Sequence, residues 1–131
     1  MHTIQLGSES EHIKITLPGE YSAEGWCKAT VEIALPRFSG RIEPWLQASD
    51  IERFATELQE LHASLRGEAK LRPVEEQFTL LVQARSGGHI AISGVARSEA
   101  TYGARLAFEM ELDQSYLPST LAQLAAVGSW R

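Results

Sequence analysis

The chain has little cysteine and no long apolar run. Only Cys27 carries a thiol among its 131 residues, which excludes an intrachain disulfide and any zinc site built from several cysteines. No stretch approaches the ~20 apolar residues of a membrane-spanning helix. Residues 1–6 also lack the basic segment followed by an apolar one that marks a secretory leader. We therefore expect a cytoplasmic protein that does not enter a membrane.

Positive charge is also scarce. The chain holds 12 Lys and Arg against 17 Asp and Glu, which gives a formal net charge of -5 and a pI near 5.4. Nucleic-acid backbones and anionic membranes select for clustered Lys and Arg, so neither is expected as the main partner. An acidic surface is instead suited to a basic protein partner.

Composition and length point to one globular domain. Hydrophobic residues make up 44% of the chain and charged residues 22%, as in folded rather than disordered proteins. A length of 131 residues fits one domain of ordinary size. We predict that residues 1–131 form a single domain.

One stretch, residues 49–67, has the period of an amphipathic helix. Ser49 and Glu52 have the spacing of a capping box at its start, and Gly67 can adopt the left-handed conformation that ends a helix. The apolar residues of this stretch recur at steps of three and four and are predicted to face a core: Ile51, Phe54, Leu58, Leu61 and Leu65.

Strand-like alternation precedes and follows this helix. A second, shorter helix is predicted within residues 113–127, with Pro118 in its first turn and Gly128 at its end. The short connections favour antiparallel hairpins. The fold class is therefore α+β, with one mostly antiparallel sheet of about six to eight strands packed against the long helix. The predicted strands are residues 2–6, 11–17, 27–35, 37–43, 68–72, 76–84, 89–97 and 104–112.

No residue pattern in the sequence indicates a catalytic group. Cys27 is on the apolar face of a predicted strand and is interpreted as a buried, inert thiol. Gly87 and Gly88 lack the flanking residues of a phosphate-binding loop and are interpreted as a turn, and His89 after them is either a titrating surface group or simply exposed. No catalytic residue, cofactor site or metal site is predicted, because no two of the four histidines have metal-ligand spacing: His2, His12, His62 and His89.

Exposed carboxylates and tryptophans give the best candidates for contact with a partner. Glu109 and Glu111 fall on the polar face of an alternating strand, where an acidic patch can steer a basic partner; acid–base catalysis by these carboxylates is the less favoured alternative. Trp26 is out of phase with the apolar face of its strand and is a candidate interface anchor, although the favoured interpretation is that Trp26 and Trp45 cover the edges of the core. Trp130 lies in the tail. The candidate partner-binding residues are Trp26, Glu32, Glu109, Glu111 and Asp113.

The pattern as a whole resembles the WapI-like immunity proteins and related small bacterial proteins of unknown function. The resemblance spans residues 26–124, and the first 17 residues add nothing to it. It implies a cytoplasmic antidote that binds and neutralises the C-terminal domain of a polymorphic toxin, without chemistry of its own. Such toxins are often basic nucleases, which fits the acidic charge. The segments that carry the resemblance are WCKATVEI (26–33), FSG (38–40), DIERF (50–54), LQEL (58–61), LRGEA (65–69), GHI (88–90), FE (108–109) and DQSYL (113–117).

The sequence is also compatible with two other functions. A small-ligand-binding or enzymatic domain would need a deep pocket between sheet and helix, lined by convergent polar groups. A protein that serves only assembly could pair the exposed edge strands of two copies, so a homodimer is the third alternative.

Overall fold

The computed structural model describes residues 1–100 and 102–127. Antiparallel strands and two α-helices alternate as an α+β protein, which confirms the predicted fold class. Pro118 lies in the first turn of the second helix as predicted, whereas Gly128 and Trp130 lie outside the described residues. The elements are β1 (His2–Gly7), β2 (His12–Leu17), β3 (Trp26–Lys28), β4 (Thr30–Leu35), β5 (Phe38–Ile42), β6 (Trp45–Gln47), α1 (Ala48–Ser64), β7 (Glu68–Leu71), β8 (Phe78–Ala84), β9 (His89–Arg97), β10 (Arg105–Asp113) and α2 (Leu117–Val127).

The strands form three sheets within the described residues, so the prediction of one large sheet is wrong. Strands β1-β2-β4-β5 form what we call the N-terminal sheet, strands β10-β9-β8-β7 form the C-terminal sheet, and β3 pairs with β6 alone. The predicted strand 27–35 is interrupted at Ala29, whose N–H donates to the carbonyl oxygen of Pro44 at 2.9 Å. Cys27, Ala29, Val31 and Ile33 are all buried in one unbroken alternation, which explains why the sequence pattern does not reveal the break.

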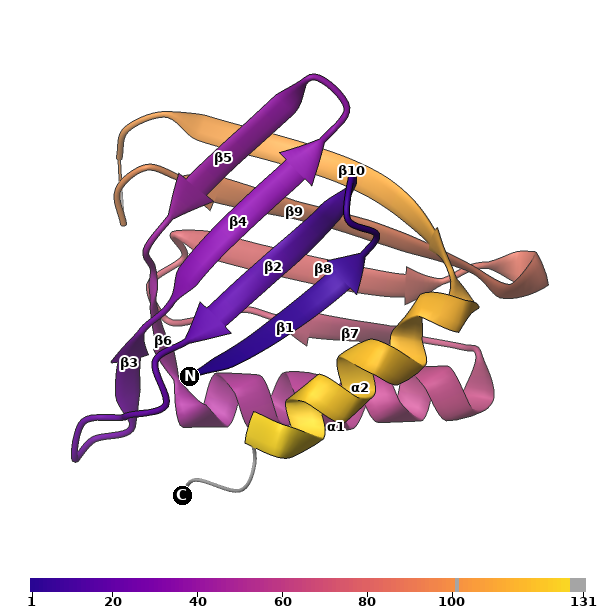
Figure 1. Cartoon of the computed structure of the whole chain (residues 1–131), viewed down its shortest axis with the longest axis horizontal. Helices are drawn as coiled ribbons and strands as arrows, with labels where there is room; N and C mark the ends of the chain where they lie inside the picture. The colour runs from indigo at the N-terminus through magenta and orange to yellow at the C-terminus, as the bar shows by residue number, and fades with distance from the viewer. Residues whose placement is uncertain (101, 128–131) are drawn as a thin grey trace.

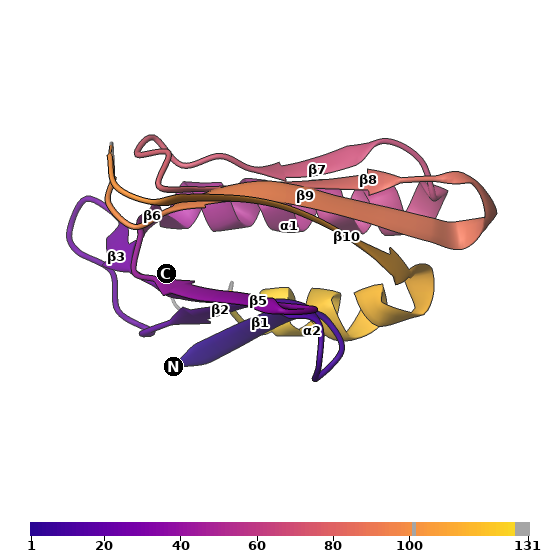
Figure 2. The ribbon, with the colours of Figure 1, turned by 90° about the horizontal axis from the view of Figure 1, so that it is seen from above.

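The two four-stranded sheets pack face to face as a sandwich (Figure 2). Their strands run at an angle to each other in Figure 1. Burying one aliphatic or aromatic side chain stabilises a fold by about 1.5–3 kcal/mol, so this layer is the main source of stability. Its buried side chains include Ile4, Leu6, Ile13, Ile15, Val31 and Ile33 from the N-terminal sheet and Leu80, Val82, Ile90, Ile92, Phe108 and Met110 from the C-terminal sheet.

The helices lie beside the sheets, which corrects the expectation that the long helix covers a sheet face. Helix α1 runs along β7 and α2 along β1 (Figures 1 and 2). The Lys70 N–H of β7 donates to Glu57 Oε1 at 2.8 Å, and the Gln5 N–H of β1 donates to Gln123 Oε1 at 2.7 Å. The Thr120 hydroxyl donates to the carbonyl oxygen of Gln5. Each helix thus supplies side-chain partners to the backbone of an edge strand.

Both predicted ends of α1 are displaced. Its first turn is held by the Gln47 N–H, which donates to Asp50 Oδ2 at 2.9 Å, so the capping pair expected at Ser49 lies two residues earlier. The helix ends at Ser64, and the residue that caps it in the left-handed conformation is Leu65, with φ of 55°; Gly67 also has a positive φ, of 84°, but lies two residues further on. Leu65 is 39% exposed and leaves the apolar stripe that was predicted to include it.

Candidate functional site

The five candidate partner-binding residues fall on three separate surfaces. Glu109, Glu111 and Asp113 are exposed and alternate with buried residues of β10, so they share the outer face of the C-terminal sheet. Glu32 lies between buried Val31 and Ile33 and faces outward from the N-terminal sheet, on the opposite side of the sandwich. Trp26 is half-buried in β3. The structure therefore brings together only the three carboxylates of β10.

Glu32 has positively charged neighbours on both sides. It is directly opposite Lys14 of β2 and directly opposite Arg41 of β5 in the ladder of the N-terminal sheet. Directly opposed side chains in a sheet lie about 4.5–5.5 Å apart at their Cβ atoms, close enough for charges to offset one another. The surface around Glu32 is consequently not acidic.

The β10 carboxylates have neutral neighbours instead. Glu109 is opposite Ser93, and Glu111 is opposite Ala91. Their negative charges are therefore not offset across the strand pair. Because both side chains are exposed, they form an acidic row that a positively charged partner can reach.

Asp113, at the end of this row, also has a local structural role. Its Oδ2 accepts a hydrogen bond from the Ser115 N–H at 2.9 Å and caps the short 3-10 helix Gln114–Tyr116. Hydrogen bonds from Ser115, with a smaller contribution from His89, lower the pKa of the Asp113 carboxyl. Asp113 therefore remains charged, but its carboxylate is partly used within the chain.

Cys27 is buried, as predicted, with only 2% of its surface exposed. Burial raises the pKa of the thiol, and a side-chain hydrogen bond with Tyr21 offsets part of that rise. Burial likewise raises the pKa of Tyr21. A neutral, buried thiol is a poor nucleophile. Within residues 1–100 and 102–127, no group of three or more His, Cys, Asp or Glu side chains is placed to hold a metal ion.

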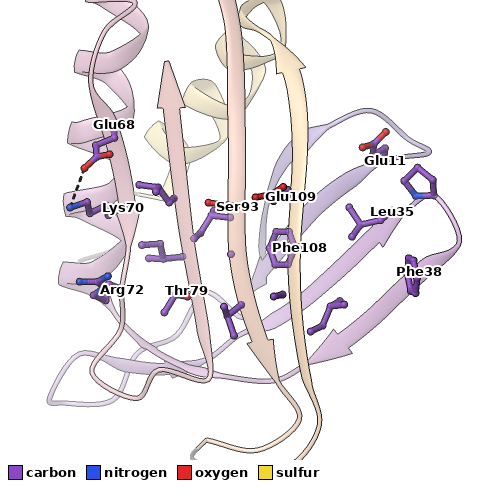
Figure 3. Close-up of a pocket in the computed structure, with 18 residues that line it drawn as sticks. Glu11, Leu35, Phe38, Glu68, Lys70, Arg72, Thr79, Ser93, Phe108 and Glu109 are labelled. Carbon is purple, nitrogen blue, oxygen red and sulfur yellow. Dashed lines mark ion pairs between the residues drawn. The ribbon is translucent and has the colours of Figure 1, made fainter. Parts of the chain in front are cut away.

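A large hollow that the sequence did not predict lies beside the acidic row. It has a volume of about 1160 Å³ and lies over the outer face of the C-terminal sheet (Figure 3). Neutral side chains of the central strands form its floor, and the tip of the β4–β5 hairpin stands beyond β10 on one side. The floor and walls include Thr79, Leu81, Ser93, Val95, Ala107 and Glu109 from the sheet and Leu35, Pro36 and Phe38 from the hairpin.

The far side of this hollow, along β7, carries charges of both signs. Lys70 Nζ lies 3.2 Å from Glu68 Oε1, and both side chains are largely exposed. Exposed pairs of this kind contribute roughly 0–1 kcal/mol, and Arg72 lies next to them. The β7 side of the hollow is thus electrically mixed, and Glu109 marks the acidic side.

Phe38 is the most exposed aromatic residue at this hollow, with 64% of its surface accessible. Phe38 pairs with Leu35 in the ladder of the N-terminal sheet. Its side chain points to the same face of that sheet as the side chains of buried Val31 and of Ile42, which pairs with Val31. Phe38 and Ile42 are four residues apart in one strand, so strand alternation alone gives them the same direction. Its exposure arises because the β4–β5 hairpin extends past β10, which only the sheet-to-sheet arrangement determines (Figure 1).

A second, smaller hollow of about 310 Å³ lies between α1 and α2. Its apolar lining comes from both helices, with Ile51 from α1 and Leu124 from α2. Glu52, Thr56 and Gln59 add polar groups, all from α1. This hollow lies between the two helices, whereas the small-ligand alternative expects a pocket between sheet and helix.

Comparison with known proteins gives one family. The model described as "Immunity protein WapI-like family" matches residues 3–130, which extends the resemblance over nearly the whole chain. No curated protein and no solved structure matches the chain. Neither described helix is long and apolar enough to cross a membrane.

Proposed function

Because this chain belongs to the WapI-like immunity protein family, we propose that it neutralises the toxic domain of a polymorphic toxin by direct protein–protein contact. The chain has no catalytic role in this proposal. It acts in the cytoplasm of the cell that also makes the toxin, where it occupies the toxin before that domain reaches its target. The toxin domain is a basic one, and neither nucleic acid nor a membrane is a partner of this chain.

The observation that carries this proposal beyond family membership is the acidic row on β10 beside the large hollow. Glu109 and Glu111 are exposed, and their cross-strand neighbours carry no charge. Opposite charges accelerate the encounter of two proteins and select the correct partner. An immunity protein benefits from both effects, because it has to capture its toxin before the toxin acts.

The test uses the toxin domain encoded beside the gene of this chain. Cells that express the toxin domain alone are expected to stop growing, and co-expression of this chain is expected to restore growth. A purified toxin domain with its catalytic residue replaced should bind the chain at a 1:1 ratio in calorimetry. Affinity should fall as salt rises, because screening weakens exposed charge pairs.

A toxin domain of similar charge from an unrelated polymorphic toxin is the control. It should neither bind nor be neutralised, because matching charge alone does not give a complementary surface. Absence of a toxin gene beside this one, or absence of binding to its purified product, would refute the proposal.

The hollow between α1 and α2 supports a second candidate, the binding of a small apolar ligand. Its volume of about 310 Å³ is at the lower end for small-molecule sites. A ligand in it should raise the unfolding temperature of the chain, and Ala55→Leu, which fills the lining, should abolish that increase. If Ala55→Leu leaves toxin neutralisation unchanged, the hollow is separate from the immunity function.

A further inference from the structure

Of the four outer edges of the two large sheets, two are hydrogen-bonded to a helix and two are open. The edges of β1 and β7 receive hydrogen bonds from side chains of α2 and α1, through Gln123, Thr120 and Glu57. The edges of β5 and β10 pair with no strand within the described part of the chain. Figure 1 shows β5 and the first part of β10 on the side of the molecule away from both helices, whereas the end of β10 leads into α2.

The backbone of β10 presents alternate residues to its open edge. The Ser98 N–H donates to the Ala104 carbonyl at 2.9 Å, and the Arg97 N–H donates to the Gln77 carbonyl at 2.8 Å. The backbone N–H and C=O groups of even-numbered β9 residues therefore form hydrogen bonds with β10, and those of odd-numbered β9 residues form hydrogen bonds with β8. Since even residues of β10 lie opposite even residues of β9, the odd residues of β10 point their N–H and C=O groups outward. Ala107, Glu109 and Glu111 thus offer unused backbone groups.

Strand β10 is a suitable template for another strand. It has nine residues, longer than most edge strands, and contains neither proline nor glycine. Edges that are protected against pairing commonly carry proline, bulges or a covering element. The protection that β10 does carry is the charge of its outward side chains: Arg105 is positive at the start of the strand, whereas Glu109, Glu111 and Asp113 along the rest of it repel acidic segments and admit basic ones.

The N-terminal sheet already extends over the place that such a strand would occupy. A Cβ atom built on Gly40 of β5 would lie 4.0 Å from Leu106 Cδ2, so β5 meets the core at the start of β10. Beyond this crossing, Leu35 and Phe38 face inward from the hairpin, with Phe38 64% exposed. A strand added to β10 would turn half of its side chains toward Leu35 and Phe38 and would cover them.

From these features we infer that an extended segment of the protein partner adds to the C-terminal sheet as a fifth strand along β10. The segment alternates apolar and basic residues: the apolar ones contact Phe38 and Leu35, and the basic ones pair with Glu109 and Glu111. Backbone hydrogen bonds supply affinity in this kind of recognition, and the alternating side chains supply specificity. The inference rests on the proposed immunity function and specifies its contact surface.

A second copy of the chain fits this edge less well. Antiparallel pairing of two β10 strands along their full length, residues 105–113, would pair Arg105 with Asp113 at each end but would place the two Glu109 carboxylates directly opposite each other at the centre. Like charges in that position destabilise a sheet. A basic segment meets the same carboxylates with the opposite charge.

The experiment measures the affinity of the inactivated toxin domain for two proline variants. Ala107→Pro removes an outward N–H of β10, where a proline is tolerated because that N–H has no partner in the sheet. Ser39→Pro is the control, because it removes an N–H from the other open edge, that of β5. Ala107→Pro should weaken toxin binding at least tenfold and Ser39→Pro less than threefold, with both variants keeping the unfolding transition of the parent chain.

Two further measurements keep the inference testable if Ala107→Pro unfolds. Reversing the charges with Glu109→Arg and Glu111→Arg should weaken binding at least tenfold, whereas the matched pair Glu24→Arg and Glu60→Arg, at exposed sites elsewhere, should not. Hydrogen exchange of the Glu109 and Glu111 amides should slow at least tenfold in the complex.

Each remaining outcome decides between the alternatives. If the toxin binds the parent chain but a folded Ala107→Pro binds equally well, or the β10 amides exchange unchanged, strand addition is wrong while the immunity function stands. If the free chain is a dimer that Ala107→Pro converts to a monomer without affecting toxin binding, the edge serves a second copy and the inference is overturned. If the parent chain does not bind the toxin at all, the proposed function fails and this inference fails with it.

Discussion

Gly94 in the middle of β9 is the position where the smallest change should have a large effect. It faces inward, opposite Phe108 of β10 and Leu80 of β8. A Cβ atom built there would lie 2.7 Å from Phe108 Cζ and closer still to the backbone carbonyl oxygen of Thr79. A phenyl ring can rotate away, but a carbonyl held in a sheet cannot move without disturbing its ladder. Gly94→Ala therefore forces a shift of β8 against β9.

The expected cost of Gly94→Ala is about 1–3 kcal/mol, the range for overpacking a well-packed core. Urea unfolding followed by tryptophan fluorescence measures it. With a slope of roughly 1–3 kcal/mol per molar urea for a chain of this size, a loss of about 2 kcal/mol lowers the midpoint by about 0.7–2 M. The slope itself should stay unchanged, because the folded and unfolded states expose similar surfaces.

A second variant separates the two close contacts at this site. Phe108→Leu removes the ring that would meet the new methyl group but leaves the Thr79 carbonyl in place. In the Gly94→Ala background, Phe108→Leu should therefore recover only part of the lost stability in a double-mutant cycle. The free energies of unfolding of Gly94→Ala and of the parent chain are expected to differ clearly. A difference below about 0.3 kcal/mol, which is within the scatter of such comparisons, would refute the packing described for β8, β9 and β10.

The other predictions concern an edge strand, the buried thiol and the exposed aromatic residue. Thr120→Val, which keeps the shape of a fully buried side chain but removes its hydrogen bond to the Gln5 carbonyl, should cost about 1–3 kcal/mol in urea unfolding; Thr120→Ser, which keeps the hydroxyl, should lose less stability than Thr120→Val, and equal losses in both variants would contradict the account. Because burial raises the pKa of Cys27 above its ordinary value of 9.0 and raises that of Tyr21 as well, both groups bind their protons more tightly in the folded chain. Their contribution to stability is therefore complete below about pH 9 and declines as pH rises beyond it; a Tyr21→Phe and Cys27→Ala double variant should lose less stability between pH 8 and pH 11 in thermal unfolding, and an equal decline would argue against this cause. Phe38→Ser should change the free energy of unfolding by less than about 0.5 kcal/mol, as surface substitutions do, yet weaken toxin binding at least tenfold; unchanged binding would remove Phe38 from the interface.

The elements and fold class follow from local patterns in the sequence. The alternation in 104–112 predicts β10 to within a residue of its observed bounds, Arg105–Asp113, and the apolar stripe Ile51, Phe54, Leu58 and Leu61 predicts the buried side of α1. These patterns are informative because neighbouring residues alone determine which side chains share a face. Family membership, likewise, was indicated by the residues themselves and is confirmed over residues 3–130.

The acidic surface shows where local patterns stop being sufficient. Glu32 and Glu109 are similar in sequence, since both are glutamates between buried apolar residues of a strand. Their surroundings differ because the ladders place Lys14 and Arg41 beside Glu32 but Ser93 beside Glu109. Which strand lies next to which, and in what register, depends on contacts between residues far apart in the chain.

The sequence by itself determined that this chain is an acidic α+β protein with hairpins, two helices, one buried thiol and membership of an immunity protein family. Only the tertiary structure decided that two four-stranded sheets pack face to face, that the strand predicted over 27–35 breaks at Ala29 so that β3 pairs with β6 alone, that the helices cover one pair of sheet edges, and that β10 is left open beside an exposed Phe38. The reason is that alternation specifies the face to which a side chain points and carries no information about what lies opposite that face. Long-range packing determines which strand edges and which sheet faces are covered. The candidate interface consists of the β10 edge and of the surface around Phe38, which this packing leaves uncovered.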